Sequence, residues 1–231
     1  QSGMRKIKRF FNAIGLPPHK RYMQWIGVFD DELKESVYSP DFLKSAANNP
    51  SDALFKSALN DTSMHLIDRL LKLDTMTYLQ DDLLVKVDIA TMSHGLEARS
   101  PLLDHRLMEF VAALPVSFKL HGTIKKYILK KVAKQFIPWK NIYRPKKGFG
   151  VPIGEWFRGE LKGILLDNVL DEQFLKAGYF NKQALQGIVT QHMSQKEDHS
   201  FQLWTLLMFS LWHRKFIGSY KCKRRHCDLF C

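Results

Sequence analysis

The chain has 231 residues, of which 45% are hydrophobic and 25% are charged. This composition is typical of a globular protein with a sizeable core, and it excludes a disordered chain, a collagen or a coiled-coil array. The formal net charge is +12, and residues 119–147 hold ten bases and no acid, which indicates a local surface for an anionic partner such as phosphate.

The first elements are predicted from helical periodicity. Residues 4–14 carry apolar side chains on one face and bases on the other, and Pro17-Pro18 ends this pattern. Residues 21–60 are predicted to form short helices and turns. Residues 62–79 carry a broad apolar stripe, which is typical of a helix that packs on one side.

A separate helix is predicted over residues 82–93. Asp81 is its expected N-cap. Gly95 is expected just beyond its C-terminus, because glycine tolerates the left-handed conformation found there. Residues 96–103 contain a proline and are predicted to be an irregular link.

The second half of the chain is predicted to hold further helices. Asp104 caps the first of them, Pro115 stops it, and Thr123 starts the next, whose sides carry lysines. Residues 144–152 are too rich in proline and glycine for regular structure. Other helices are predicted near 154–169, 181–194 and 199–217, the last as a buried core helix.

No stretch alternates apolar and polar residues for long enough to predict a strand. The periodicity therefore predicts a mainly α fold in one domain, residues 1–217. A basic tail, residues 218–231, is expected to be disordered.

The tail holds all three cysteines, Cys222, Cys227 and Cys231. A disulfide framework is therefore excluded for the body of the chain. A zinc site that includes His226 and a frayed end with free thiols are the two alternatives, and the spacing favours free thiols.

No membrane-spanning segment is expected. The longest uncharged apolar stretch, residues 201–212, is shorter than a bilayer requires, and no signal-peptide pattern follows the first bases. A cytoplasmic location is therefore expected.

Two segments hold candidate residues for chemistry. The link after residue 93 brings Glu97, Arg99 and Asp104 together among leucines, where charges must find partners, so a structural ion pair is expected. Further on, Lys126 lies near a Gly-Thr helix start, where it can neutralise phosphate oxygens. The alternative for Lys126 is a solvated lysine face.

A third segment combines cations with glycines. Lys146 and Lys147 precede Gly148, and the glycines there permit a tight turn that comes close to a ligand. This pattern suits a loop that closes over a polyphosphate, and it equally suits a surface turn.

The segments LVKVDIATMSHGLEARSPLLDHRLMEFVAALP, KKYILKK and RPKKGFGVPIGEWFRGEL resemble the glutamine-dependent asparagine synthetases. The resemblance covers roughly residues 65–217 and falls in the C-terminal half of the synthetase domain. It implies the helical C-terminal part of an adenine nucleotide α-hydrolase-like (ATP pyrophosphatase) α/β domain, with the parallel sheet mostly missing.

The resemblance also implies an ATP-dependent carbon–nitrogen ligase. Such enzymes adenylate the side-chain carboxylate of aspartate with ATP and Mg²⁺, and ammonia derived from glutamine then displaces AMP. Lys126 and Glu97 are the catalytic residues that the resemblance implies, and it implies no metal ligand. The substrate- or ATP-binding residues implied are Arg99, Asp88, Lys146, Lys147 and Gly148.

Several parts of the family pattern are absent from the sequence: the S-G-G-x-D-S pyrophosphate loop, the acidic G-E/D-G-x-D-E segment and the glutaminase domain. The chain is therefore expected to be a fragment that is inactive alone and needs the missing N-terminal part as a partner. The lysine-dense strip and the Glu97 link are expected to form one wall of a nucleotide cleft. Removal of the sheet is expected to leave an apolar face exposed, which favours an oligomer.

Two alternative functions remain. A related amidotransferase acting on another carboxylate shares these motifs. A non-catalytic helical module that binds acidic partners is the other, although nucleic acid is not the expected partner because the basic charge is local.

Overall fold

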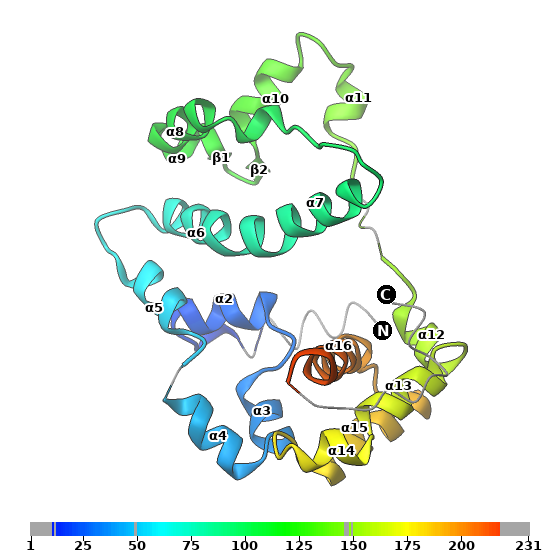
Figure 1. Cartoon of the computed structure of the whole chain (residues 1–231). Coiled ribbons are helices and arrows are strands. Elements are labelled where there is room, and N and C mark those ends of the chain that lie inside the picture. Colours follow the sequence, from blue (N-terminus) through cyan, green and yellow to red (C-terminus); the bar gives the residue numbers. More distant parts are fainter. Residues whose placement is uncertain (1–10, 12, 49, 146–147, 149, 218–231) are drawn as a thin grey trace. The chain divides into compact units, whose positions relative to one another are not determined.

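The computed structural model describes residues 11, 13–48, 50–145, 148 and 150–217, and this part of the chain is built almost entirely of helices (Figure 1). The prediction of a mainly α fold is therefore confirmed. The chain divides into two compact units. Unit 1 comprises residues 1–53 and 149–231, and unit 2 comprises residues 54–148. The predicted helix at 4–14 lies largely outside the described residues, and the predicted tail at 218–231 lies wholly outside them.

Unit 1 combines helices from both ends of the chain. The helices before unit 2 are α2 (Pro18–Ile26), α3 (Asp31–Val37) and α4 (Pro40–Ala47). Those after it are α12 (Ile153–Arg158), α13 (Lys162–Val169), α14 (Glu172–Lys176), α15 (Lys182–Met193) and α16 (Ser200–Phe216).

The core of unit 1 is built around α16. Its residues Leu203, Leu206 and Leu207 are buried, and their three- and four-residue spacing places them on one face of the helix. The predicted helix is thus confirmed, but it is not buried all round, because Phe201 and Phe216 are exposed. The remaining core comes from other helices of the unit: Val37, Phe157, Leu165, Val169, Leu185, Ile188 and Val189.

The two segments of unit 1 are joined by backbone hydrogen bonds. The amide of Ser39 donates to the carbonyl of Tyr179 (2.9 Å), and the amide of Asn181 donates to the carbonyl of Val37 (2.8 Å). Between them, the rings of Tyr38 and Phe180 pack with centroids 5.7 Å apart. Residues about 140 positions apart in the sequence thus form one structural unit.

The helix predicted near 154–169 is divided in two. Helix α12 ends at Arg158, and α13 begins at Lys162. Gly159 between them has φ −111° and ψ −113°, which glycine adopts more readily than residues that carry a Cβ. The break allows Phe157 and Leu165 to enter the same core.

Unit 2 contains most of the predicted site. Its helical elements are α5 (Ala53–Asn60), α6 (Leu66–Asp74), the π-helix η1 (Thr75–Leu84), α7 (Val85–Met92), the 3₁₀ turn η2 (Pro101–Leu103), α8 (His105–Ala113), α9 (Val116–Lys119), α10 (Tyr127–Ala133) and α11 (Trp139–Ile142). Its two short antiparallel strands are β1 (Leu120–His121) and β2 (Ile124–Lys125).

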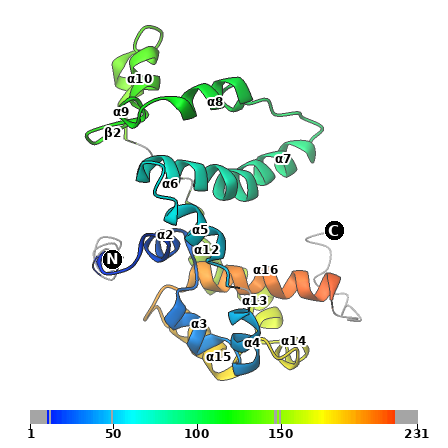
Figure 2. The ribbon, with the colours of Figure 1, turned by 90° about the vertical axis from the view of Figure 1, so that its left-hand side faces the viewer.

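One continuous helix runs from α6 through η1 to α7, as Figure 2 shows. The prediction of a break with Asp81 as an N-cap is therefore wrong. No glycine or proline interrupts residues 66–92. The hydroxyls of Thr75 and Thr77 instead donate to the carbonyls of Leu71 and Leu73, each at 2.8 Å. Such bonds compete with the α-helical ladder, and the wider π turns begin at this point.

The predicted ends of the neighbouring elements are confirmed. Gly95 has φ +67° just beyond α7. The amide of Leu96 donates to the carbonyl of Thr91 (3.0 Å), which closes the end of the helix. Asp104 caps α8 by accepting from the amide of Arg106 at 3.0 Å.

A Gly95→Ala substitution is expected to lower the free energy of unfolding of unit 2 by about 1 kcal/mol, because alanine is strained at positive φ. The measurement is urea denaturation, with hydrogen exchange of the α7 amides as a local readout. Gly163→Ala is the matched control, since Gly163 lies within α13 and nothing stands within 4 Å of its Cβ position. The control is expected to be neutral or slightly stabilising. Equal losses in both variants would contradict the prediction.

Unit 2 buries few apolar residues of its own. Among the described residues of this unit, Leu59 and Leu73 are the buried hydrophobic side chains. Large apolar residues on α7, α8 and α10–α11 are instead exposed, including Ile89, Phe110, Phe136 and Trp139. This is the kind of surface expected when a packing partner is absent. The oligomer expected from the sequence stays a prediction.

Candidate functional site

Lys126 follows the β1–β2 hairpin. Leu120 pairs with Lys125, and His121 pairs with Ile124, across a two-residue turn. Gly122 in this turn has φ +56°, a conformation common in tight hairpins. The helix predicted to start at Thr123 therefore begins at Tyr127, because residues 120–125 use their backbone groups to pair with one another.

Lys126 itself has a left-handed backbone, with φ 57° and ψ 41°. Among the described residues other than glycine, it shares positive φ only with Gln195. This conformation costs an L-residue roughly 1–2 kcal/mol, and such strain is concentrated at functional sites. The carbonyl of Lys126 accepts from the amide of Lys130 (2.9 Å), so the strained residue also opens α10. Its side chain is exposed.

Aromatic rings near this helix start contact one another and the ammonium groups of neighbouring lysines. The rings of His121 and Tyr127 stack with centroids 4.7 Å apart. Lys131 Nζ lies 5.4 Å from the centre of the Tyr127 ring, and Lys130 Nζ lies 5.1 Å from that of Tyr143. Rings attract ammonium groups without neutralising them. Because residues 119–147 contain no acid, the segment keeps a strong positive field.

The hairpin is tied to the long helix by an ion pair that sequence reasoning missed. Lys119 Nζ, just before β1, lies 2.7 Å from Asp68 Oδ1 on α6 and 2.8 Å from the carbonyl oxygen of Ala112. The two charged residues are 51 positions apart. The only sequence signal was an acid and a base, each beside an apolar stripe.

The predicted ion pair in the link after α7 is present. Arg99 Nη2 lies 2.8 Å from Glu97 Oε1. The side chains are 81% and 71% exposed, so the expectation of a buried pair among leucines is wrong. The surrounding leucines explain this difference, because Leu96 and Leu102 are themselves exposed. A pair this exposed contributes about 1 kcal/mol or less to stability.

Asp104 pairs with Arg106 rather than Arg99. Its Oδ2 lies 3.3 Å from Arg106 Nη2. The hydrogen bond from the Arg106 side chain holds the pKa of the Asp104 carboxyl below its usual value. Asp104 therefore stays charged as the cap of α8.

The remaining candidates are distributed along unit 2. Asp88 is exposed on α7, and its carbonyl oxygen accepts from the hydroxyl of Thr91 (3.2 Å). Gly148 is exposed, and nothing lies within 4 Å of its Cβ position. Lys146 and Lys147 lie outside the described residues.

The structure keeps the Lys126 region apart from the Glu97–Arg99 pair. The Asp68–Lys119 pair holds the hairpin at the beginning of α6, whereas Glu97 follows the end of α7 by five residues. A helix over residues 66–92 is roughly 40 Å long, and a link of five residues is too short to return along it. In the described part of unit 2, these residues do not form one continuous wall.

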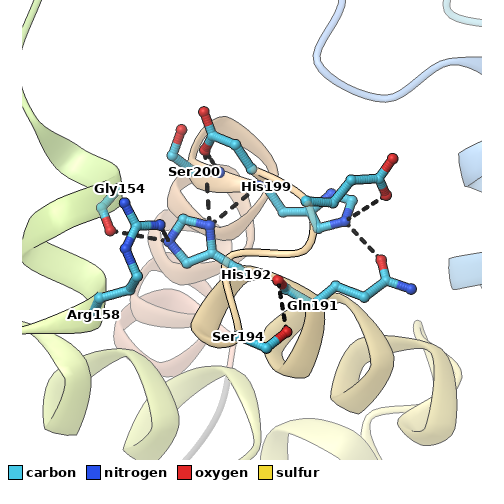
Figure 3. Close-up of polar contacts among 9 residues, drawn as sticks. Gly154, Arg158, Gln191, His192, Ser194, His199 and Ser200 are labelled. Carbon is cyan, nitrogen blue, oxygen red and sulfur yellow. Dashed lines mark hydrogen bonds and ion pairs between the residues drawn. The ribbon is translucent and has the colours of Figure 1, made fainter. Parts of the chain in front are cut away.

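A second polar cluster lies in unit 1 and was not predicted (Figure 3). His192 on α15 is fully buried. Its Nδ1 accepts from the amide of His199 (3.2 Å), so its Nε2 carries the proton and donates to the carbonyl of Gly154 (3.1 Å). The guanidinium of Arg158 lies 3.3 Å from the same Nε2. Burial is the largest cause that lowers the pKa of His192, and the Arg158 guanidinium lowers it further. The ring is therefore held neutral.

Gly154 allows α12 to approach this ring. A Cβ at this position would lie 3.3 Å from His192 Cε1. The histidine thus connects the start of α12 to the turn between α15 and α16.

The described ranges contain no group of three or more His, Cys, Asp or Glu side chains arranged to hold a metal ion. No helix in those ranges has the length and hydropathy needed to cross a membrane.

Comparisons with known proteins give a family match over most of the chain. The family model described as asparagine synthase matches residues 5–214. A Mycobacterium tuberculosis protein, provisionally named as a glutamine-hydrolysing asparagine synthetase, is 37% identical over 153 residues, which is 65% of this chain and 23% of that protein. Asparagine synthetase 1 of Bacillus subtilis is 28% identical over 200 residues, which is 85% of this chain and 30% of that protein.

A glutamine-hydrolysing asparagine synthetase of Gallus gallus is 32% identical over 113 residues, 46% of this chain and 18% of its own. The chain thus spans less than a third of the length of each of these relatives. No solved structure matches it significantly.

Proposed function

The chain belongs to the asparagine synthase family, and from this premise we propose that it takes part in ATP-dependent synthesis of asparagine, with Lys126 as the cation that meets the phosphate oxygens. The observation that carries the proposal is the left-handed backbone of Lys126 between a closed hairpin and a helix start. The conformation is costly for a lysine, and the side chain it presents is exposed within an acid-free segment.

In the proposed reaction the side-chain carboxylate of aspartate attacks the α-phosphorus of ATP, which breaks the bond to the β-phosphate, releases pyrophosphate and leaves the aspartyl adenylate. Ammonia then displaces AMP to give the amide. Negative charge builds up on phosphate oxygens as pyrophosphate leaves. An ammonium held beside those oxygens stabilises this charge more than the starting state, which accelerates the step. We assign this role to Lys126.

The other candidates receive lesser roles in the proposal. Glu97, its partner Arg99 and Asp88 belong to the other end of the long helix from Lys126, so the proposal gives them no part in the phosphate step. The segment Lys146–Gly148 is assigned to substrate or ATP binding. Because the described residues offer no cluster of carboxylates, no step is assigned through Mg²⁺. The sequence lacks the S-G-G-x-D-S loop, so the chain is assigned phosphate binding and not the whole reaction.

The experiment is isothermal titration calorimetry of pyrophosphate with the full chain at low ionic strength. Lys126→Ala is expected to weaken binding about tenfold or more, because it removes a charge aimed at the anion. Lys126→Gly is expected to weaken binding equally without loss of stability, since glycine adopts positive φ freely. Lys126→Arg is expected to retain most of the affinity.

Lys140→Ala is the matched control. Lys140 is an exposed lysine on α11 in the same acid-free segment. Its removal lowers the net charge by the same amount and is expected to weaken binding about twofold. If Lys126→Ala and Lys140→Ala weaken binding equally, the charge acts as a diffuse field and the assignment to Lys126 fails.

A second candidate function is a helical module that binds acidic partners, which the acid-free segment favours. Competition separates the two proposals. The binding module would be supported if a single-stranded oligonucleotide displaced pyrophosphate and if Lys126→Ala and Lys140→Ala lost the same amount of affinity. A loss of pyrophosphate affinity in Lys126→Ala that Lys140→Ala does not share supports the phosphate site of an amide ligase. This holds whether the acceptor is aspartate or another carboxylate.

A further inference from the structure

We propose that Asp68 and Lys119 form a positioning pair that fixes where the Lys126 ammonium stands. The inference rests on the proposed function of Lys126. It adds two residues, neither of which is expected to touch a substrate.

The pair is well shielded from water. The side chain of Lys119 is 9% exposed and that of Asp68 is 21% exposed. Every other Lys or Arg ion pair with Asp or Glu that the structure describes has at least one side chain more than half exposed. A shielded pair is screened less by solvent, and the loss of one partner leaves the other charge uncompensated. The pair can therefore hold an element in place.

Lys119 holds three elements together. Its ammonium contacts Asp68 near the start of α6 and the carbonyl of Ala112 near the end of α8, while its own backbone ends α9 and leads into β1. The hairpin is too short to be stable alone, because each strand has only two residues. Its position therefore depends on this anchor.

The register of the hairpin determines where Lys126 lies relative to Lys119. Leu120 lies opposite Lys125, so the next residues outward, Lys119 and Lys126, stand at the same end of the hairpin. On its other side, Lys126 precedes Tyr127, whose ring stacks on His121 of β1. The strained residue is thus held from both sides.

The same geometry leaves the charge of Lys126 available. Asp68 is occupied by Lys119 at 2.7 Å, and the described structure contains no ion pair of Lys126 with an acid. Lys119 therefore pairs with the Asp68 carboxylate, whereas the ammonium of Lys126 is left to bind an anion.

The test is a double-mutant cycle on pyrophosphate affinity in the full chain. Asp68→Asn keeps the shape of the side chain and removes its charge, and it is expected to weaken binding about tenfold. In a Lys126→Ala background the same change is expected to have no further effect, because Asp68 acts only through Lys126. A structural role that merely loosened the unit would weaken binding by the same factor in both backgrounds.

Asp82→Asn is the matched control. It breaks the exposed pair with Lys86, in which the atoms are 3.9 Å apart and the side chains 53% and 64% exposed. It is expected to leave the affinity unchanged. Lys119→Arg, a milder variant that can keep the ion pair, is expected to retain most of the affinity and covers the case in which Asp68→Asn unfolds unit 2.

A second readout does not need pyrophosphate. Hydrogen exchange at residues 121–125 and the ring shifts of Tyr127 report on the hairpin directly. Both are expected to change in Asp68→Asn and not in Asp82→Asn. If the wild-type chain fails to bind pyrophosphate but these signals change as expected, the proposed function fails and the anchoring stands. Unchanged hairpin signals, or equal effects in both backgrounds, overturn the positioning pair.

Discussion

Phe157→Ala is expected to lower the free energy of unfolding of unit 1 by about 3–5 kcal/mol, the usual loss when a fully buried phenylalanine is truncated. Phe157 is fully buried on α12, and its ring centroid lies 6.2 Å from that of Trp204 on α16. Because protein cores are closely packed, the neighbours can fill the vacated volume only in part. Urea denaturation followed by circular dichroism measures the loss.

Phe201→Ala provides the control. Phe201 is a phenylalanine on α16 that is 67% exposed, so its truncation removes little packing. Its cost is expected to be below about 1 kcal/mol. Comparable losses in the two variants would show that Phe157 does not stand in the core.

The stability of unit 1 is also expected to fall as the pH drops below the ordinary range of histidine. The pKa of His192 is lowered in the folded chain, chiefly by burial, whereas the unfolded chain has a histidine of ordinary pKa. Between these two values the unfolded state binds more protons, so stability increases with pH there. The contribution is complete above the unfolded pKa and is lost as the pH falls towards the folded one.

The surroundings of His192 determine this direction. On α12, Arg158 opposes a positive ring, and on the turn before α16, His199 opposes it while Asp198 favours it. Since Nδ1 already accepts from the His199 amide, a proton there would place two donors against each other. Burial, the largest cause, and the two opposing groups outweigh the Gly154 carbonyl and Asp198, which both raise the pKa of His192.

His192→Gln is expected to lower the free energy of unfolding of unit 1 by about 2–3 kcal/mol at neutral pH. An amide side chain at this position cannot hydrogen-bond both the Gly154 carbonyl and the His199 amide. The same variant is expected to lose the part of the pH dependence that His192 contributes. Urea denaturation between pH 5 and 8 measures both. His105→Gln, an exposed histidine on α8, is the control and should keep the wild-type profile. A His192→Gln profile parallel to wild type would contradict the prediction.

Features that depend on neighbouring residues could be predicted from the sequence. The turn at Gly95 and the cap at Asp104 follow from local chemistry, and both are confirmed. The division at Gly159 and the π turns after Thr75 were missed. A glycine in a helical pattern and a threonine within a helix each permit regular structure, so the pattern alone does not reveal the interruption.

The site was predictable only in part. The sequence singled out Lys126 by its place near a Gly-Thr helix start, and the resemblance added its role. Its backbone conformation was not predicted, because lysine has no preference for positive φ. The Asp68–Lys119 pair and the contact between His192 and Gly154 join residues 51 and 38 positions apart. Contacts of this range depend on how the helices pack, which periodicity does not encode.

The division of unit 1 into two segments has a consequence for how the protein is made. Residues 37–39 pair with residues 179–181, and the core surrounds α16. A ribosome therefore completes all of unit 2 before the first segment meets its partner. A premature stop codon before residue 179 would release helices α2 to α4 without the backbone partners of residues 37–39 and without α16. Such truncated chains would expose the apolar faces of these helices and would be substrates for cellular proteases.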